Sequence, residues 1–375
     1  MRKLDVELLT KKVDEHISAD IANAFVGGVT VIVNQDGKRV LKRTYEDEVF
    51  KNINDDTLYR LASMTKPIIA VAIMILRDRG LLSVEDNISK YLPAFAEMNI
   101  GKLDENDQPV FVSKAEKQIR IRDLLTHSSG LGSELVGMKA WDRRPESCKD
   151  LLEKSVDYYA ETYLGFEPAT KQMYSPAMAF DVLGRIVEIV SGKSLEDFLQ
   201  KEIFIPLGMT HTTFNPTEEQ WGKFVPMHNN HDGKQSFDPM EKGFVFEGVP
   251  HTCYCGAGGL ASTAEDYSKF AEMLLGGKGI LCDETIREMS SPQLSDIMKG
   301  EMVWGFGMRV IVQDVYKDLP VGSFGWGGAY GTHFWVDPEN KITAIYMKNT
   351  RYNGEISSRT VRVFERDVTT SLIGE

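Results

Sequence analysis

Segments typical of β-strands gather near both ends of this chain. Near the N-terminus, residues 29–33 (VTVIV) and 39–41 (RVL) flank Asp36-Gly37, a pair that favours a tight hairpin turn. Four more strand-like segments lie near the C-terminus: MRVIV (308–312), SFGWGG (323–328), THFWV (332–336) and ITAIYM (342–347). We therefore expect one antiparallel sheet built from both ends of the chain, covered by a first helix and by a last helix near 356–373.

The middle of the chain shows helical patterns instead. Three segments carry helical spacing of apolar residues or helix-terminal signals: 120–131, 175–192 and 262–277. Gly130 and Gly192 close the first two and suit left-handed C-terminal caps. Ser175 and Thr263 suit N-terminal caps. The Asp266 side chain is placed to accept the backbone N–H of Thr263 and so complete a capping box.

These patterns predict an α+β chain with two lobes. Residues 1–80 and 260–375 are expected to form an α/β sandwich lobe, an antiparallel sheet flanked by helices. Residues 81–259 are expected to form an inserted, mainly helical lobe. Within it, 215–255 shows little periodicity and predicts irregular loops, and the loops near 86–118 and 215–255 are expected to shape a pocket.

The composition excludes several classes of protein. The formal net charge of the 375 residues is −12, and no long basic run occurs, which argues against a nucleic-acid or anionic-membrane partner. Asp5 and Glu7 interrupt the apolar run that a signal peptide needs. Four cysteines in a chain of this length predict no disulfide framework. We expect a cytoplasmic enzyme or binding protein.

A serine and a lysine are spaced for nucleophilic chemistry in LASMTKPIIA (61–70). Ser63 and Lys66 are three residues apart and share one face of a helix, so the amine can reach the hydroxyl. Pro67 favours a helix that starts at Ser63, since a proline is tolerated in the first turn. At that end of the helix the dipole pushes the lysine toward its neutral form, which can act as a base. The spacing alone fits equally a surface lysine beside a helix-start proline.

Several motifs in the same order as in a known family resolve this choice. They are SMTKP, DLLTHSSGL, VLGRIVEIVSGKSLEDF, PLGMTHTTF, GGLASTAEDYSKFAEML and FGWGGAYGTHFWVDP. Together they resemble the serine β-lactamase-related family, which includes class C β-lactamases, DD-peptidases and family VIII carboxylesterases. The resemblance runs from about Gly27 to about Asn349, and it implies the β-lactamase/transpeptidase-like fold.

The resemblance implies roles for three side chains. Ser63 corresponds to the nucleophile and Lys66 to its base partner. Tyr174, in MYSPA, corresponds to the tyrosine of the family's Tyr-x-Asn element. It precedes a predicted helix, where the dipole and a hydrogen bond from Lys66 would favour its phenolate.

The third element of the family is Lys-Thr-Gly in β-lactamases, and here Trp326, Gly327 and Gly328 occupy that place. The resemblance assigns these three residues to substrate binding. It also implies an oxyanion hole made by the backbone N–H groups of Ser63 and Ala329. No G-x-S-x-G motif of another hydrolase class occurs in the chain.

Two departures from the family pattern bear on the substrate. Trp326 replaces a lysine that holds a carboxylate, and Pro176 replaces an asparagine that contacts an amide and the lysine. Both changes favour a neutral small-molecule ester over a β-lactam or peptide. We expect a serine esterase without cofactor or metal. The alternatives are a β-lactamase, a D-aminopeptidase, an acyltransferase, or an inactive penicillin-binding-like interaction protein.

Other motifs favour structural roles. His228 and His231 lack the glutamate of a zinc-protease motif and predict a solvated loop. Cys253 and Cys255 lack a second pair and predict small packed residues. His333, close to the third element, fits a strand residue that faces solvent, although a functional role stays open.

Two further segments belong to the expected surroundings of the site. GAGGLA (256–261) follows no apolar strand, which argues against dinucleotide binding, and the resemblance implies that this loop lines the active site. His127, Ser128 and Ser129 are expected to shape the junction between the lobes. A histidine of a Ser-His-Asp triad is not needed where tyrosine and lysine move the proton.

Overall fold

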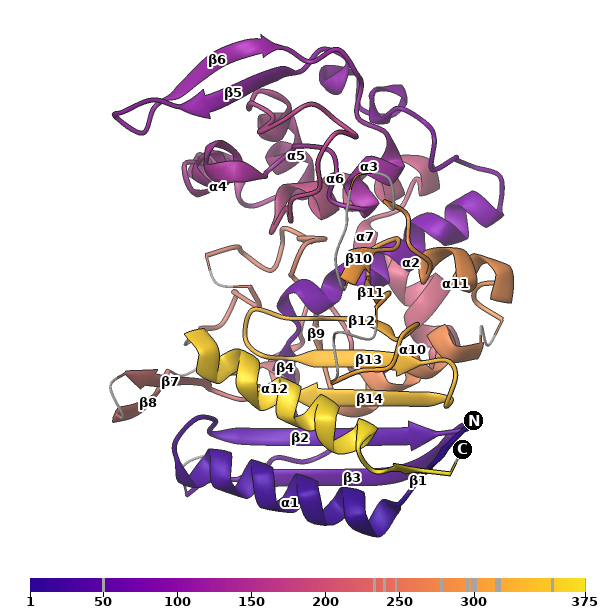
Figure 1. Ribbon diagram of the computed structural model, residues 1–375. Helices are drawn as coiled ribbons and strands as arrows, with labels where there is room; N and C mark the ends of the chain where they lie inside the picture. The colour runs from indigo at the N-terminus through magenta and orange to yellow at the C-terminus, as the bar shows by residue number, and fades with distance from the viewer. Residues whose placement is uncertain are drawn as a thin grey trace.

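A seven-stranded antiparallel sheet combines the two ends of the chain, as expected (Figure 1). The computed structural model describes residues 1–48, 51–231, 234–238, 241–246, 248–276, 279–294, 297, 302–313, 318–351 and 354–374. In spatial order the strands are β10 (Met302–Trp304), β11 (Arg309–Ile311), β12 (Phe324–Gly327), β13 (His333–Asp337), β14 (Ile342–Met347), β2 (Gly28–Gln35) and β3 (Lys38–Glu46). All six predicted strands are present, and β10 adds one that was not predicted.

The junction between the two ends of the chain is the pairing of β14 with β2. Their register places Ile345 opposite Ile32, and both strands are buried almost throughout because both faces of the sheet are covered. The β2–β3 hairpin turns at Asp36 and Gly37, whose φ angles of 51° and 71° are those of the predicted tight turn.

Helices cover both faces of this sheet. The first helix, α1 (Val6–Ala22), packs against the last, α12 (Gly354–Thr369), on one face. Apolar residues such as Val13 and Phe364 belong to the core beneath them. On the other face, α10 (Ala264–Gly276) packs on β13, β14 and β2. Figure 1 shows α1 and α12 together on one side of the strands.

The rest of the chain is mostly helical and lies next to the β10 end of the sheet (Figure 1). It contains α2 (Thr65–Asp78), α3 (Ile121–Leu125), α4 (Glu134–Asp142), α5 (Leu152–Ala160), α6 (Met178–Ser191), α7 (Leu195–Leu199), α8 (Ile205–Leu207) and α9 (Glu218–Trp221), while α11 (Asp283–Met289) follows α10. Helix α2 packs on α6 and is buried almost along its whole length. None of the described helices is long and apolar enough to cross a membrane. The lobe boundaries at 80/81 and 259/260 stay a prediction.

Short strand pairs complete the structure. They are β1 (Lys3–Leu4) with β15 (Leu372–Ile373), β4 (Tyr59–Arg60) with β9 (Ala261–Ser262), β5 (Asn99–Leu103) with β6 (Pro109–Lys114), and β7 (Met227–His231) with β8 (Lys234–Asp238). The hairpins β5–β6 and β7–β8 correct the prediction of loops at 86–118 and of irregular loops at 215–255. Strands β7 and β8 are mostly polar, and β6 is largely exposed although Val110, Phe111 and Val112 follow one another in it, so the alternation that marks a half-buried strand is missing.

Two of the predicted helix ends are also corrected. Helix α3 ends at Leu125 rather than at Gly130, because the backbone of His127 already turns into the left-handed region with φ of 56°. Helix α6 begins at Met178, although the Ser175 hydroxyl does accept the Ala179 N–H at 3.3 Å. The left-handed cap at Gly192, φ 67°, is confirmed.

The predicted start of α10 is confirmed in part. The Thr263 hydroxyl accepts the N–H of Asp266 at 3.1 Å, as an N-terminal cap does. The capping box is not completed, because the Asp266 carboxylate accepts the N–H of His211 at 2.7 Å instead of the N–H of Thr263.

Candidate active site

Ser63 lies in a single 3₁₀ turn, Ala62–Met64, that leads into helix α2. The α-helix thus begins at Thr65, two residues later than predicted, and Pro67 still falls within its first turn, where its missing N–H costs no hydrogen bond. The residue before the serine, Ala62, has φ of 45°, a left-handed conformation that is unusual for alanine. The turn therefore holds Ser63 at the positively polarised end of the helix.

Lys66 is completely buried one turn after Ser63, and its amine has three neighbours. Nζ donates to the carbonyl oxygens of Pro176 at 2.7 Å and Ala257 at 2.8 Å, and it lies 3.0 Å from Ser63 Oγ. The two carbonyls can only accept, so they take two N–H groups and leave the third position of the nitrogen directed at the hydroxyl. Pro176 thus replaces the asparagine of the family pattern through its main chain.

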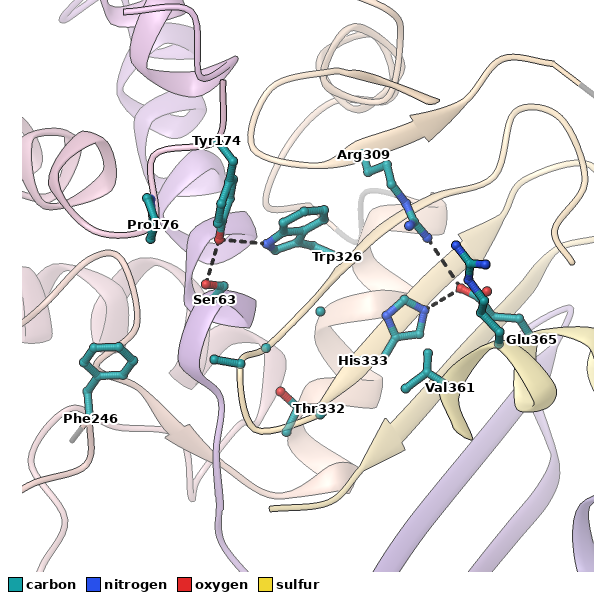
Figure 2. A pocket seen from close by; sticks show the side chains of 15 residues that line it. Ser63, Tyr174, Pro176, Phe246, Arg309, Trp326, Thr332, His333, Val361 and Glu365 are labelled. Carbon is teal, nitrogen blue, oxygen red and sulfur yellow. Dashed lines mark hydrogen bonds and ion pairs between the residues drawn. The ribbon is translucent and has the colours of Figure 1, made fainter. Parts of the chain in front are cut away.

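Tyr174 approaches the same hydroxyl from the loop before α6. Its OH is 2.8 Å from Ser63 Oγ, and Trp326 Nε1 donates to the phenolic oxygen at 3.4 Å (Figure 2). The predicted hydrogen bond between Lys66 and Tyr174 is replaced by two separate bonds to Ser63 Oγ. Lys66 Nζ instead lies 5.2 Å from the centre of the tyrosine ring.

His127 packs against the ring of Tyr174 and hydrogen-bonds to the next residue of the chain. Its Nδ1 accepts the N–H of Ser175, the next residue in the chain, at 3.1 Å, and its ring lies 4.6 Å from the Tyr174 ring. Burial, with the nearby charge of Lys66, holds the pKa of His127 well below its usual range. A neutral imidazole therefore orients Tyr174. This is the contact that His127 makes where the sequence predicted a junction between the lobes.

The third predicted element comes within reach of Ser63 at the end of β12. Gly328 packs so closely on the carbonyl of Leu61 that a Cβ there would overlap it, and the Thr332 hydroxyl donates to the same carbonyl at 3.0 Å. Within the described part of the chain, no acceptor is present for the backbone N–H groups of Ser63 and Ala329. A tetrahedral oxyanion formed at Ser63 would need two donors of this kind.

A cavity of about 460 Å³ joins these groups. The side near Ser63 has the aromatic rings of Tyr174, Phe246 and Trp326 in its wall, together with Pro176. Figure 2 shows Phe246 on one side of Ser63, and Arg309, His333 and Glu365 beyond Trp326 on the other. The cavity volume lies in the range of small-molecule sites.

Asp181 is a component of the site that the sequence did not indicate. This carboxylate is completely buried on α6; Oδ1 accepts the N–H of Ala257 at 3.1 Å, and Oδ2 accepts the hydroxyl of Tyr159 at 2.9 Å. Burial raises the pKa of Asp181, and the positive charge of Arg144 opposes that rise. Because the carbonyl of Ala257 contacts Lys66, the loop 256–261 does reach the site, as the resemblance implied.

Of three other expectations, those for His333 and His228 were wrong, and the one for the two cysteines is confirmed. His333 does not face solvent: it is 6% exposed, and its Nε2 lies 2.8 Å from Glu365 Oε1. His228 is completely buried on β7 rather than in a solvated loop, 3.3 Å from Gln235 Oε1. Cys253 and Cys255 are buried in the core, as predicted. In the residues that the structure describes, no group of three metal-ligating side chains occurs.

The chain is similar to known proteins over most of its length. The family model described as Beta-lactamase matches residues 13–366. Protein Rv1367c of Mycobacterium tuberculosis is 33% identical over 326 residues, which cover 78% of this chain and 77% of that protein. Esterase EstB of Burkholderia gladioli is 28% identical over 392 residues, which cover 96% of this chain and 95% of that protein. The solved structure of EstCE1, a hydrolase with promiscuous acyltransferase activity, matches with a TM-score of 0.77 and 24% identity, covering 97% of this chain and 99% of that one.

Proposed function

We propose that this chain, which belongs to the beta-lactamase family, is a serine carboxylesterase for esters of short- to medium-chain acids. The observation that carries the proposal is the position of Ser63 Oγ, within hydrogen-bond distance of both Lys66 Nζ and Tyr174 OH. A hydroxyl held between an amine and a phenol can lose its proton as it attacks a carbonyl. The identity to Esterase EstB supports the choice of esters.

The proposed reaction follows from the roles of these groups. Ser63 Oγ attacks the ester carbonyl carbon, and its proton passes to the Tyr174/Lys66 pair. The N–H groups of Ser63 and Ala329 stabilise the oxyanion, and loss of one such donor typically costs about 3 kcal/mol. The tetrahedral intermediate then collapses, the bond between the carbonyl carbon and the alcohol oxygen breaks, and Tyr174 returns the proton to the leaving alcohol, which leaves the acyl group on Ser63 Oγ. Water then attacks the acyl-enzyme by the same steps and releases the acid.

The walls of the cavity support a neutral acyl group. Tyr174, Phe246 and Trp326 offer aromatic surface close to Ser63, and the family's carboxylate-binding lysine is absent at Trp326. Aromatic surface favours alkyl or aryl chains over charged ones. The volume of about 460 Å³ sets a limit on the size of the ester.

Hydrolysis of p-nitrophenyl butyrate tests the proposal. The wild type should release p-nitrophenol, Ser63→Ala should abolish turnover, and Ser147→Ala, at an exposed serine, should leave it unchanged. A fluorophosphonate probe should label Ser63 in the wild type. Turnover that persists in Ser63→Ala would refute the assignment, and failure of the probe to label Ser63 would favour an inactive interaction protein. Preferential hydrolysis of nitrocefin or of a D-amino acid amide would replace the esterase with a β-lactamase or an aminopeptidase.

A further inference from the structure

The cavity at Ser63 has a second half with different chemistry. Beyond Trp326 it continues over Gly327 and Gly328 to side chains from three elements: Arg309 on β11, His333 on β13, and Glu365 on α12 (Figure 2). These groups are polar or charged, whereas the half near Phe246 is aromatic. An ester bound at Ser63 has two arms, and the cavity offers a different environment to each.

His333 is held in one tautomer by its partner. Nε2 lies 2.8 Å from Glu365 Oε1, and the Glu365 side chain is 1% exposed, with Arg309 Nη2 a further 3.5 Å contact. A carboxylate accepts hydrogen bonds, so Nε2 carries a proton, and in the neutral ring Nδ1 then presents a lone pair. The second ring nitrogen of His333 is therefore a hydrogen-bond acceptor.

That acceptor has no partner from the described residues of the protein, although the His333 side chain is more than nine-tenths buried. Nδ1 lies against Gly327, where an added Cβ would come to 3.2 Å from it. Because residue 327 is a glycine, nothing covers the nitrogen on this side, and it faces the cavity that both residues line. A ligand or water in the cavity can therefore reach this acceptor and donate a hydrogen bond to it.

We infer that this half of the cavity, with His333 Nδ1 as its acceptor, binds a hydroxyl group on the alcohol arm of the ester. The inference rests on the proposed function, in which the apolar acyl chain lies against the aromatic half. The alcohol arm then extends over Gly327 and Gly328 toward His333, and its hydroxyl donates to Nδ1. The substrate class is an ester of a polyhydroxylated alcohol, such as a glycerol monoester.

Two butyrates of equal alcohol length test this inference. Propyl butyrate and 2,3-dihydroxypropyl butyrate share the acyl group and differ in two hydroxyls. In the wild type we expect kcat/KM to favour the hydroxylated ester. In His333→Phe the ratio should fall by about three- to tenfold, which corresponds to the loss of one neutral hydrogen bond. His333→Gln, whose amide can donate to Glu365 and still offer an oxygen, should retain part of the preference.

Two further measurements keep the test decisive. Gly327→Ala covers Nδ1 while leaving the His333–Glu365 contact in place, so it should lower the same ratio even if His333→Phe does not fold. Titration calorimetry can measure the binding of both esters to Ser63→Ala and to Ser63→Ala/His333→Phe. This measurement does not depend on turnover. Absence of turnover with tighter binding of the hydroxylated ester would refute the esterase but keep the subsite. Equal kcat/KM for the two esters in the wild type, or a preference that survives in both His333→Phe and Gly327→Ala, would overturn the inference.

Discussion

Asp181 and Lys66 are linked through the main chain of Ala257. The Asp181 carboxylate accepts the Ala257 N–H at 3.1 Å, and the Ala257 carbonyl accepts from Lys66 Nζ at 2.8 Å. All three groups are buried. The Asp181 carboxylate does not contact Ser63, but through Ala257 it helps to orient the Lys66 amine, which does contact Ser63 Oγ.

Replacement of Asp181 tests this link. In Asp181→Ala the Ala257 segment loses its anchor, and we expect kcat to fall by about 10- to 100-fold with KM nearly unchanged, as for a supporting residue of a reactive group. Asp181→Asn keeps an oxygen for the Ala257 N–H and should recover most of the activity. Tyr159→Phe breaks the other contact of Asp181 and is the matched control. Equal losses in Tyr159→Phe and Asp181→Ala would indicate a general packing effect.

Gly328 offers a test of the oxyanion hole. A Cβ at this position overlaps the Leu61 carbonyl and the Thr332 hydroxyl, so Gly328→Ala must move the end of β12 away from the turn that carries Ser63. We expect kcat for p-nitrophenyl butyrate to fall by about 100- to 1000-fold, the usual effect of a lost oxyanion donor. Gly276→Ala, at a helix end with open space around it, should have no such effect. Full activity in Gly328→Ala would exclude Ala329 from the oxyanion hole.

Trp326 donates to the oxygen of Tyr174, and this contact can be removed without loss of the aromatic wall. In Trp326→Phe the 3.4 Å hydrogen bond disappears and the ring remains. Because the bond is long, we expect a decrease in kcat of only about three- to fivefold. Trp326→Ala also removes contact with the acyl chain and should raise KM for butyrate over acetate. If both variants change only KM, the indole N–H takes no part in proton transfer.

Glu265 gives a pH-dependent stability. Partial burial alone would raise the pKa of Glu265, but hydrogen bonds from Arg39 and Lys42 outweigh it and lower the pKa from 4.5 to about 2. A carboxyl whose pKa is lowered by folding stabilises the fold above its unfolded value and loses this effect as the pH falls toward 2. We expect Glu265→Gln to lower the free energy of unfolding by about 1 kcal/mol at pH 7, after allowance for solvent screening.

Urea unfolding at several pH values measures this contribution. The difference between wild type and Glu265→Gln should be constant above about pH 5 and should shrink below pH 4.5. Glu105→Gln, at an exposed glutamate in the β5–β6 turn, controls for the change of charge. A difference that persists at pH 2 would show that the Arg39 and Lys42 contacts do not stabilise the fold.

Local sequence signals predicted six strands of the main sheet, but they missed two hairpins and misplaced the end of α3. The six predicted strands and the Asp36-Gly37 turn depend on neighbouring residues, and they are present. The β5–β6 and β7–β8 hairpins were missed because β7 and β8 are mostly polar and the apolar residues of β6 are consecutive, so the sequence shows no alternation there. The left-handed backbone at His127 ended α3 early, since long-range contacts such as that between His127 Nδ1 and the Ser175 N–H hold this segment.

The candidate site shows the same division. Ser63 and Lys66 are neighbours on one helical turn, so their contact follows from spacing. The resemblance, rather than spacing, brought in Tyr174, which is 111 residues away from Ser63. No pattern indicated Asp181, because its partner Ala257 is distant in the sequence, and the buried environment of His333 depends on α12 packing over β13.

The sequence by itself determined six strands of the main sheet and the placing of Lys66 one turn after Ser63, because these features depend on propensity and on spacing along one element. The tertiary structure decided which groups surround them. Two distant segments supply the carbonyl partners of Lys66 Nζ, and the packing of α12 over the sheet converts an expected surface histidine into a buried one. Such contacts arise only when distant segments pack together, and packing selects partners that no local pattern records.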